Sequence, residues 1–291
     1  MRIKSLICLC LLVSVIDVLA DSLRYFTQSI DAPKVKFEYG NNTPAGCYVQ
    51  ADDAKLYYEV YGKGGEPILI LHGGGVGCAL EMGAFIDRLA VSNKVIVMSS
   101  RGHGRSGIGT KPVTQAQKAA DVKAVLDDAK VDSATLIGFS DGGYSAYDFA
   151  AAYPDRVKKM VAIGAGELVP GLRKVVIRLD AMEQFDPAYF EQQRGLMPEP
   201  ERWQEFLDDF SRFYNECVYS KVLYAKITCP VLLVVGEKDG NAPLSTVLAA
   251  YQQLPNAQLA VIAGAPHPCF VTDFAVVWEQ VSKFLGNGCK E

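Results

Sequence analysis

One serine of this chain stands in a setting that suits a nucleophile. Ser140 lies within residues 138–143 (GFSDGG), between a strand-like apolar stretch at 134–137 and a helical pattern of small residues at 144–152. The G-x-S-x-G spacing between a strand and a helix is typical of a sharp turn in which glycines avoid steric clashes. We therefore expect the Ser140 Oγ to project from this turn, at the positive end of the helix. An ordinary glycine-rich turn is the alternative.

A histidine and an acidic residue follow two other apolar runs in the same way. His267 comes shortly after residues 259–262 (LAVI), and Asp239 shortly after residues 231–235 (VLLVV). In an open parallel sheet, ligands bind outside the carboxyl ends of the strands, so these side chains should meet Ser140 at one edge. His267 can remove the serine proton if a carboxylate holds its other nitrogen in the right tautomer. The chain order Ser, Asp, His is a known order for such a triad.

Two other carboxylates compete for the acid role. Glu237 lies nearer the end of its strand, where its reach is less, and Asp273 is expected to open the last helix. Asp239 is preferred because two extra residues let the loop turn toward the strand end from which His267 emerges.

A glycine-rich run at residues 72–75 (HGGG) follows another strand-like segment at the same edge. Developing oxyanion charge needs fixed donors, and we expect the backbone N–H groups of Gly74 and Asp141 to be the pair. A phosphate-binding loop is the alternative, but neither G-K-[ST] nor G-x-G-x-x-G follows. His72 and His103 are expected to make structural hydrogen bonds.

The elements that must position these residues alternate along the chain. Short apolar runs predict strands buried on both faces, as in a parallel sheet, at residues 67–71, 95–98, 135–137, 160–163, 231–235 and 259–262. Helical patterns lie between them at residues 80–90, 114–126 (with a capping box of Thr114 and Gln117), 144–152, 245–254 and 274–285. An antiparallel hairpin of residues 47–50 and 55–61 should precede them. The sequence thus predicts an α/β fold with a doubly wound, mostly parallel sheet.

The chain divides into three parts by composition. Residues 1–20 are a predicted signal peptide, with Arg2 and Lys4 before an apolar run that is too short for the roughly 20 residues of a membrane span. We therefore expect a secreted or periplasmic protein with no stable membrane span after signal removal. Residues 21–44 predict a polar leader, and residues 45–291 the folded domain. Within it, residues 167–226 have no parallel-strand run but many aromatic residues, and predict a small helical cap.

Charge and cysteine usage limit the partners. The formal net charge of −4 and the absence of a basic stripe argue against nucleic acid. No C-x-x-C or zinc-like spacing occurs, so we expect no metal, and the chemistry needs no cofactor. Six cysteines remain after signal removal and could form disulfides in an exported chain or stay reduced and partly buried: Cys47, Cys78, Cys217, Cys229, Cys269 and Cys289.

Taken together, these motifs resemble those of the α/β-hydrolase superfamily. HGGG, RGHGRS at residues 101–106, GFSDGG, GEKD at residues 236–239 and the late histidine occur in order between about residues 57 and 285. The GFSDGG and GEKD runs are similar to the biphenyl-hydrolase-like and valacyclovir-hydrolase branch. The resemblance implies that Ser140 is the nucleophile, Asp239 the acid and His267 the base, under a cap at residues 167–226. The chain departs from many relatives at Ser99, where they carry Asp.

The predicted function is that of an exported serine hydrolase. It would cleave a carboxylic ester, thioester, lactone or amide through an acyl-enzyme on Ser140. The aromatic cap suggests a small-molecule substrate with an apolar acyl or aryl group, although cap helices also need aromatic cores. Carbon–carbon bond hydrolysis and perhydrolysis use the same arrangement and remain open. A ligand receptor or binding protein on a hydrolase scaffold is an alternative of another class.

Overall fold

A single eight-stranded sheet runs through the part of the chain that the computed structural model describes, residues 22–286. The predicted signal peptide and Cys289 lie outside these residues. The strands are β1 (Gly46–Ala51), β2 (Ala54–Tyr61), β3 (Pro67–Leu71), β4 (Lys94–Met98), β5 (Ala134–Phe139), β6 (Val157–Ile163), β7 (Val231–Gly236) and β8 (Ala257–Ile262). Their order is β1-β2-β4-β3-β5-β6-β7-β8. β1 and β2 form the predicted antiparallel hairpin, and the strands from β4 to β8 pair in parallel.

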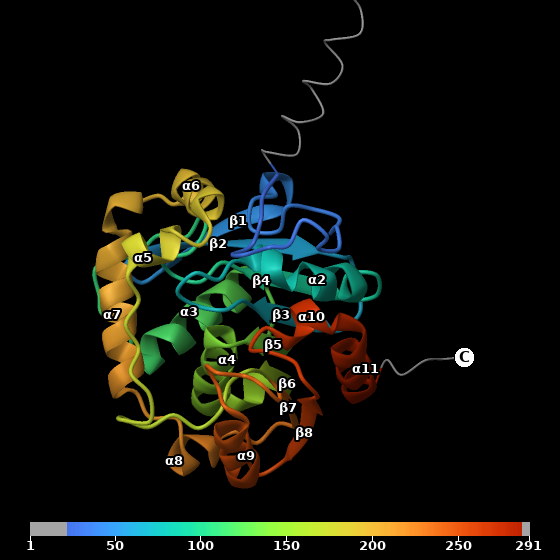
Figure 1. The fold of residues 1–291 in the computed structure, drawn as a ribbon. Helices are drawn as coiled ribbons and strands as arrows, with labels where there is room; N and C mark the ends of the chain where they lie inside the picture. The colour runs from blue at the N-terminus through green and yellow to red at the C-terminus, as the bar shows by residue number, and fades with distance from the viewer. Residues whose placement is uncertain (1–21, 287–291) are drawn as a thin grey trace, which may run out of the picture.

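Helices cover both faces of this sheet, as a doubly wound fold requires (Figure 1). The helices of the main domain are α2 (Gly83–Leu89), α3 (Gln115–Asp128), α4 (Asp141–Ala152), α9 (Leu244–Gln253), α10 (Cys269–Thr272) and α11 (Phe274–Leu285). α2 and α11 share one face, where the rings of Phe85 and Phe274 lie 5.0 Å apart. α3 and α4 pack together on the other face. The predicted fold class is confirmed.

Two details of the sequence-based prediction are wrong. The run at residues 259–262 is not buried on both faces, because β8 is the edge strand and Val261 is 44% exposed. The capping box of α3 is only half formed. Thr114 Oγ1 accepts the Gln117 N–H at 3.1 Å, but the Gln117 side chain bonds to Asp121 instead of returning to Thr114.

A helical insertion separates β6 from β7. It comprises α5 (Leu179–Glu183), α6 (Pro187–Leu196), α7 (Trp203–Glu216) and α8 (Lys221–Tyr224), and in Figure 1 its orange helix α7 runs along the outside of α3. The base of this cap is tied by a two-residue bridge, in which Leu168 and Tyr219 exchange backbone hydrogen bonds of 3.0 and 2.7 Å. All five aromatic side chains of α7 are buried.

The segment before the sheet is fastened to that cap. We call residues 22–42 the N-terminal strap. The backbone N–H of Thr27 donates to the Asp186 carboxylate at 2.8 Å, and Arg24 pairs with the same carboxylate at 3.2 Å. The ring of Phe26 packs against Tyr189 and Phe190 of α6 at centroid distances of 5.7 and 5.8 Å. The polar leader is therefore packed against the cap.

The other end of the strap is held by the sheet. Glu59 of β2 is fully buried and accepts the backbone N–H groups of Gly40 and Asn42 at 2.9 and 2.7 Å. The hydroxyls of Tyr57 and Tyr61 complete its hydrogen bonding at 2.9 and 2.8 Å. The strap thus joins the cap to β2, two parts of the molecule that are far apart in sequence.

Among residues 22–286 no cysteine is paired. Cys47 is exposed, whereas the remaining thiols of this part of the chain are buried, namely Cys78, Cys217, Cys229 and Cys269. No helix in the same range is long and apolar enough to cross a membrane.

Candidate active site

Ser140 occupies the turn between β5 and α4. Its backbone has φ 51° and ψ −114°, a conformation that strains a non-glycine residue by about 1–3 kcal/mol. The flanking glycines permit the tight packing around it. A Cβ at Gly138 would lie 2.2 Å from the Gly142 carbonyl oxygen, and a Cβ at Gly142 would lie 2.3 Å from the Leu71 oxygen. Positions 138 and 142, two residues before and two residues after this serine, therefore accept only glycine.

The structure brings Ser140, His267 and Asp239 together in one chain of hydrogen bonds. His267 Nε2 lies 2.9 Å from Ser140 Oγ, and His267 Nδ1 lies 2.7 Å from Asp239 Oδ2. The other carboxylate oxygen of Asp239 accepts the N–H groups of Asn241 and Ala242 at 2.8 and 2.7 Å. Because an ionised carboxylate only accepts, it places the imidazole proton on Nδ1 and leaves Nε2 free to accept the serine proton.

The two competing carboxylates are directed elsewhere. Glu237 Oε2 accepts the backbone N–H of Gly264 at 2.7 Å. Asp273 precedes α11 and accepts the Thr272 hydroxyl at 2.6 Å, without capping the helix through its side chain. Neither is hydrogen-bonded to His267.

The glycine run after β3 faces the N-terminus of α4. A Cβ at Gly74 would lie 2.6 Å from Asp141 Cβ and 2.4 Å from Phe210 Cζ, so these residues are in close contact. Within the described residues, the backbone N–H groups of Gly74 and Asp141 donate no hydrogen bond. They are therefore available to a developing oxyanion. The N–H of Gly73 is bound by Glu81 Oε1 at 2.6 Å, which anchors this run.

The remaining histidines have structural contacts. His72 Nδ1 lies 2.6 Å from the Gly73 oxygen, and Nε2 accepts the Ser100 N–H at 3.0 Å. Burial lowers the pKa of His72 to about 3, so its ring is neutral at physiological pH. His103 Nδ1 lies 2.9 Å from the Arg101 oxygen, while its buried Nε2 has no partner.

Apolar side chains surround the reacting groups. The Phe139 ring lies 4.9 Å from the His267 ring, and Phe210 of α7 touches Gly74. Ile177, in the loop that leads into the cap, lies within 3.0 Å of the position that a Cβ on Gly75 would take. The cap thus supplies apolar groups directly over the glycine run.

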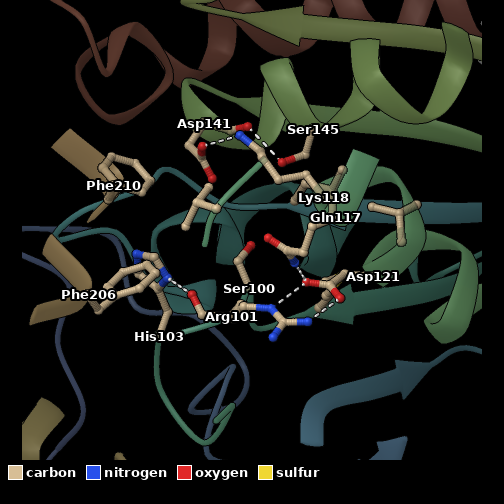
Figure 2. Close-up of a pocket in the computed structure, with 14 residues that line it drawn as sticks. Ser100, Arg101, His103, Gln117, Lys118, Asp121, Asp141, Ser145, Phe206 and Phe210 are labelled. Carbon is tan, nitrogen blue, oxygen red and sulfur yellow. Dashed lines mark hydrogen bonds and ion pairs between the residues drawn. The ribbon is translucent and has the colours of Figure 1, made fainter. Parts of the chain in front are cut away.

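A small cavity lined by both apolar and charged side chains lies beside the serine turn (Figure 2). Its volume of about 30 Å³ is enough for one or two water molecules. Its wall includes Ser100, His103, Lys118 and Asp141, with Phe206 and Phe210 of the cap on one side, but neither Ser140 nor His267. Arg101 closes the opposite side through a bidentate pair with Asp121 at 3.0 and 2.9 Å. The cavity is therefore adjacent to the candidate triad of Ser140, His267 and Asp239 and does not contain the Ser140 hydroxyl.

Lys118 and Glu81 were missed by sequence reasoning. Lys118 forms a buried ion pair with Asp141. Its spacing to Val122 and Val125 places it on the buried stripe of α3. A lysine at such a position indicates a buried charge that needs a partner, so the sequence did contain a signal for it. Glu81 had no comparable signal, because its contact with Gly73 depends on how the loop after β3 folds back. Among residues 22–286, no three His, Cys, Asp or Glu side chains are grouped as metal ligands would be.

Comparison with known proteins agrees with this architecture. Residues 66–205 match a family model described as "alpha/beta hydrolase fold". The chain is similar to the putative carbamate hydrolase RutD of Azorhizobium caulinodans, with 28% identity over 82% of this chain and 98% of that protein. It is 24% identical to 2-hydroxy-6-oxononadienedioate/2-hydroxy-6-oxononatrienedioate hydrolase 1 of Dechloromonas aromatica, over 80% and 88% of the two chains.

Solved structures give the same result. The meta-cleavage product hydrolase CumD of Pseudomonas fluorescens IP01 aligns with a TM-score of 0.73 at 19% identity, over 84% of this chain and 99% of its own. Est816, described as an N-acyl homoserine lactone degrading enzyme, aligns with a TM-score of 0.63 at 26% identity, over 82% of this chain and 100% of its own.

Proposed function

Since the chain belongs to the α/β-hydrolase superfamily and is a hydrolase, we propose that it is a serine hydrolase that forms an acyl-enzyme on Ser140. The substrate is a carboxylic ester, or the related thioester, lactone or amide. The observation that carries this proposal is the hydrogen-bonded series of Ser140 Oγ, His267 and Asp239, at 2.9 and 2.7 Å.

The geometry supports a two-stage reaction. His267 Nε2 takes the proton as Ser140 Oγ attacks the carbonyl, and Asp239 stabilises the imidazolium that forms. The N–H groups of Gly74 and Asp141 stabilise the oxyanion, and His267 then protonates the leaving group. Water activated by His267 attacks the acyl-enzyme, and collapse of the second tetrahedral intermediate releases the acid and restores the serine hydroxyl.

The substrate is proposed to be a small molecule with an apolar acyl or aryl group. Phe139, Phe210 and Ile177 support this, because they place apolar surface around the reacting atoms. A panel of chromogenic esters that differ in acyl length tests it. The proposal predicts that kcat/KM rises with apolar surface in the acyl group. A preference for short or charged acyl groups contradicts it.

Covalent labelling tests the nucleophile. A fluorophosphonate should form one adduct, on Ser140, and Ser140→Ala should abolish labelling and lower kcat by about 10⁴ or more. Ser282→Ala is the matched control, because this serine lies on α11 and bonds only to the Glu279 oxygen. Undiminished labelling of Ser140→Ala would refute the assignment. A parent protein that binds the ester without steady turnover would instead favour the receptor alternative.

Carbon–carbon bond hydrolysis is the second candidate. It is favoured by the relatives named as 2-hydroxy-6-oxononadienedioate/2-hydroxy-6-oxononatrienedioate hydrolases and as meta-cleavage product hydrolases. The loss of absorbance of a 2-hydroxy-6-oxo-dienoate measures this reaction directly. A kcat/KM for the dienoate at least about a hundredfold above that of the best ester, a barrier difference near 2.7 kcal/mol, would establish this candidate instead.

We propose further that residues 1–20 direct export of the chain and are then removed. Arg2 and Lys4, the apolar run of residues 6–16 and the small residues near Ala20 support this. N-terminal sequencing of the protein from its native host should give a start at Asp21 in a secreted or periplasmic fraction. A start at Met1 in the cytosolic fraction contradicts it.

A further inference from the structure

Two charged side chains are buried together beside the proposed oxyanion donors. Lys118 of α3 and Asp141 of α4 form an ion pair, and their side chains are only 8% and 7% exposed (Figure 2). The Tyr214 hydroxyl of cap helix α7 donates to the same carboxylate oxygen and lies 3.2 Å from Lys118 Nζ. Removing two charges from water is costly, and apolar side chains often fill such a space equally well. The pair therefore calls for a role besides packing.

The position of Asp141 supplies that role. Its N–H is one of the two proposed oxyanion donors, and covalent geometry keeps its carboxylate within about 5 Å of that nitrogen. The residue that carries the second donor also packs against Asp141, because a Cβ on Gly74 would lie 2.6 Å from Asp141 Cβ. A negative charge thus stands beside the place where the reaction generates another.

That carboxylate is ionised in the folded protein. Burial alone raises the pKa of Asp141, but the charge of Lys118 and the hydrogen bonds from Lys118 and Tyr214 outweigh burial and hold the pKa below its usual value. The Tyr214 hydroxyl remains protonated, because burial and the nearby Asp141 charge raise its pKa. Asp141 is thus matched by one cation and one neutral donor.

We infer that Lys118 is a positioning residue of the hydrolytic reaction: it neutralises Asp141 so that the oxyanion forms beside an ion pair rather than beside a lone negative charge. The inference rests on the proposed serine-hydrolase function. An uncompensated charge at this range changes the rate by about one to two orders of magnitude. Because Tyr214 belongs to cap helix α7, the position of this helix also affects the charge balance beside the oxyanion hole.

Removing one charge and then both tests the inference on a chromogenic ester. Assayed at about pH 9, where the buried and unpaired Asp141 carboxyl still carries its charge, Lys118→Met should lower kcat at least about tenfold and leave KM within about threefold, because that charge opposes the transition state. Lys118→Met with Asp141→Asn removes both charges and keeps the backbone N–H, so it should recover most of the lost kcat. Lys123→Met is the matched control, since this lysine is exposed on the same helix and pairs with Asp127. It should keep the parental kcat.

Each outcome bears on the inference. Parental kcat in Lys118→Met, or a double variant no faster than the single one, overturns it. If circular dichroism shows that Lys118→Met does not fold, the double variant and Tyr214→Phe test the inference in its place. The double variant should fold with kcat within about tenfold of the parent, and Tyr214→Phe should lower kcat by about threefold or more; failure of either overturns the inference.

A parent that neither labels with fluorophosphonate nor hydrolyses esters refutes the proposed function as well. A labelled, active parent with unaffected lysine variants refutes only the role of Lys118.

Discussion

Glu237 accepts the backbone N–H of Gly264 at 2.7 Å and so holds the loop that precedes His267, without bonding to the histidine itself. Asp239, two residues later, reaches His267 Nδ1 at 2.7 Å. The two acids after β7 thus have separate tasks: one shapes a loop and the other orients an imidazole.

Substituting each acid by its amide should separate these tasks. Asp239→Asn should lower kcat by about 10⁴, the size of the effect that the same substitution has in the triad of a serine protease, because an amide no longer fixes the tautomer. Glu237→Gln keeps an acceptor for Gly264 and should retain kcat within about tenfold, a barrier change of at most about 1.4 kcal/mol. Steady-state kinetics of both variants with one ester is the measurement. The reverse ranking would make Glu237 the acid.

The glycine run should depend on Glu81. Its Oε1 atom accepts the Gly73 N–H at 2.6 Å, next to the proposed donor Gly74. Burial raises the pKa of the Glu81 carboxyl to about 8, so this acceptor is mostly the neutral acid at pH 7. Glu81→Ala leaves that N–H unbound and should lower kcat by about tenfold through a looser oxyanion hole. Glu81→Gln keeps an acceptor and is the matched control, with kcat within about threefold of the parent. Equal kcat in Glu81→Ala and the parent would show that the glycine run at residues 72–75 keeps its conformation without Glu81.

Asp148 should make stability depend on pH. It is buried with hydrogen bonds from Tyr219 at 2.7 Å and Gln115 at 3.2 Å. Burial raises its pKa to about 7, although the charge of Lys118 and the Tyr219 hydrogen bond oppose the rise. The unfolded carboxyl titrates near 3.9, so between about pH 4 and pH 7 the folded protein keeps a proton that the unfolded chain has lost. The free energy of unfolding therefore falls as the pH rises through this window, and the full cost is present above it.

Asp148→Asn should remove this dependence. We expect a flatter stability profile between about pH 4 and 7 and, at pH 8, a free energy of unfolding higher by about 2–4 kcal/mol. Urea unfolding at several pH values is the measurement, and Asp132→Asn, at an exposed position, is the control. A variant with the parental pH profile would show that Asp148 is already ionised in this range.

The N-terminal strap should stabilise the cap. The Asp186 carboxylate accepts hydrogen bonds from the Tyr189 N–H at the start of α6 and from the Thr27 N–H of the strap. It also forms an ion pair with Arg24. Asp186→Ala removes all three, and we expect a loss of about 2 kcal/mol and a Tm lower by about 4–8 °C. Asp180→Ala is the control, because that carboxylate is 74% exposed and pairs only with Arg178 and the start of its own helix. Scanning calorimetry compares the two, and equal Tm values would contradict a stabilising strap.

The sheet could be read from the sequence because its inner strands leave an unmistakable pattern. A strand covered by helices on both faces must be apolar throughout, as β7 is, and such runs need no knowledge of their neighbours. β8 gave the same signal in its apolar run but lies at the edge, where only one neighbour pairs with it. Position within a sheet is a tertiary property, so the exposure of Val261 could not be predicted.

The candidate triad could be predicted from the positions of the strands. Ser140, Asp239 and His267 each come shortly after a strand, and the parallel arrangement brings strand ends together. Contacts that depend on a particular side chain crossing between layers could not be foreseen. Lys118 reaches Asp141 from a different helix, and Thr27 meets Asp186 across 159 residues of sequence. No local pattern encodes either pairing.

Because the strap packs against the cap, the cap and the strap form one structural unit. Exchanging residues 167–226 alone with a related hydrolase would leave Thr27 and Phe26 facing a foreign α6, while Glu59 would still hold the other end of the strap to β2. A transplantable specificity module of this protein is therefore discontinuous: it consists of the inserted helices together with the residues that precede the sheet, and chimeras should carry both pieces from one parent.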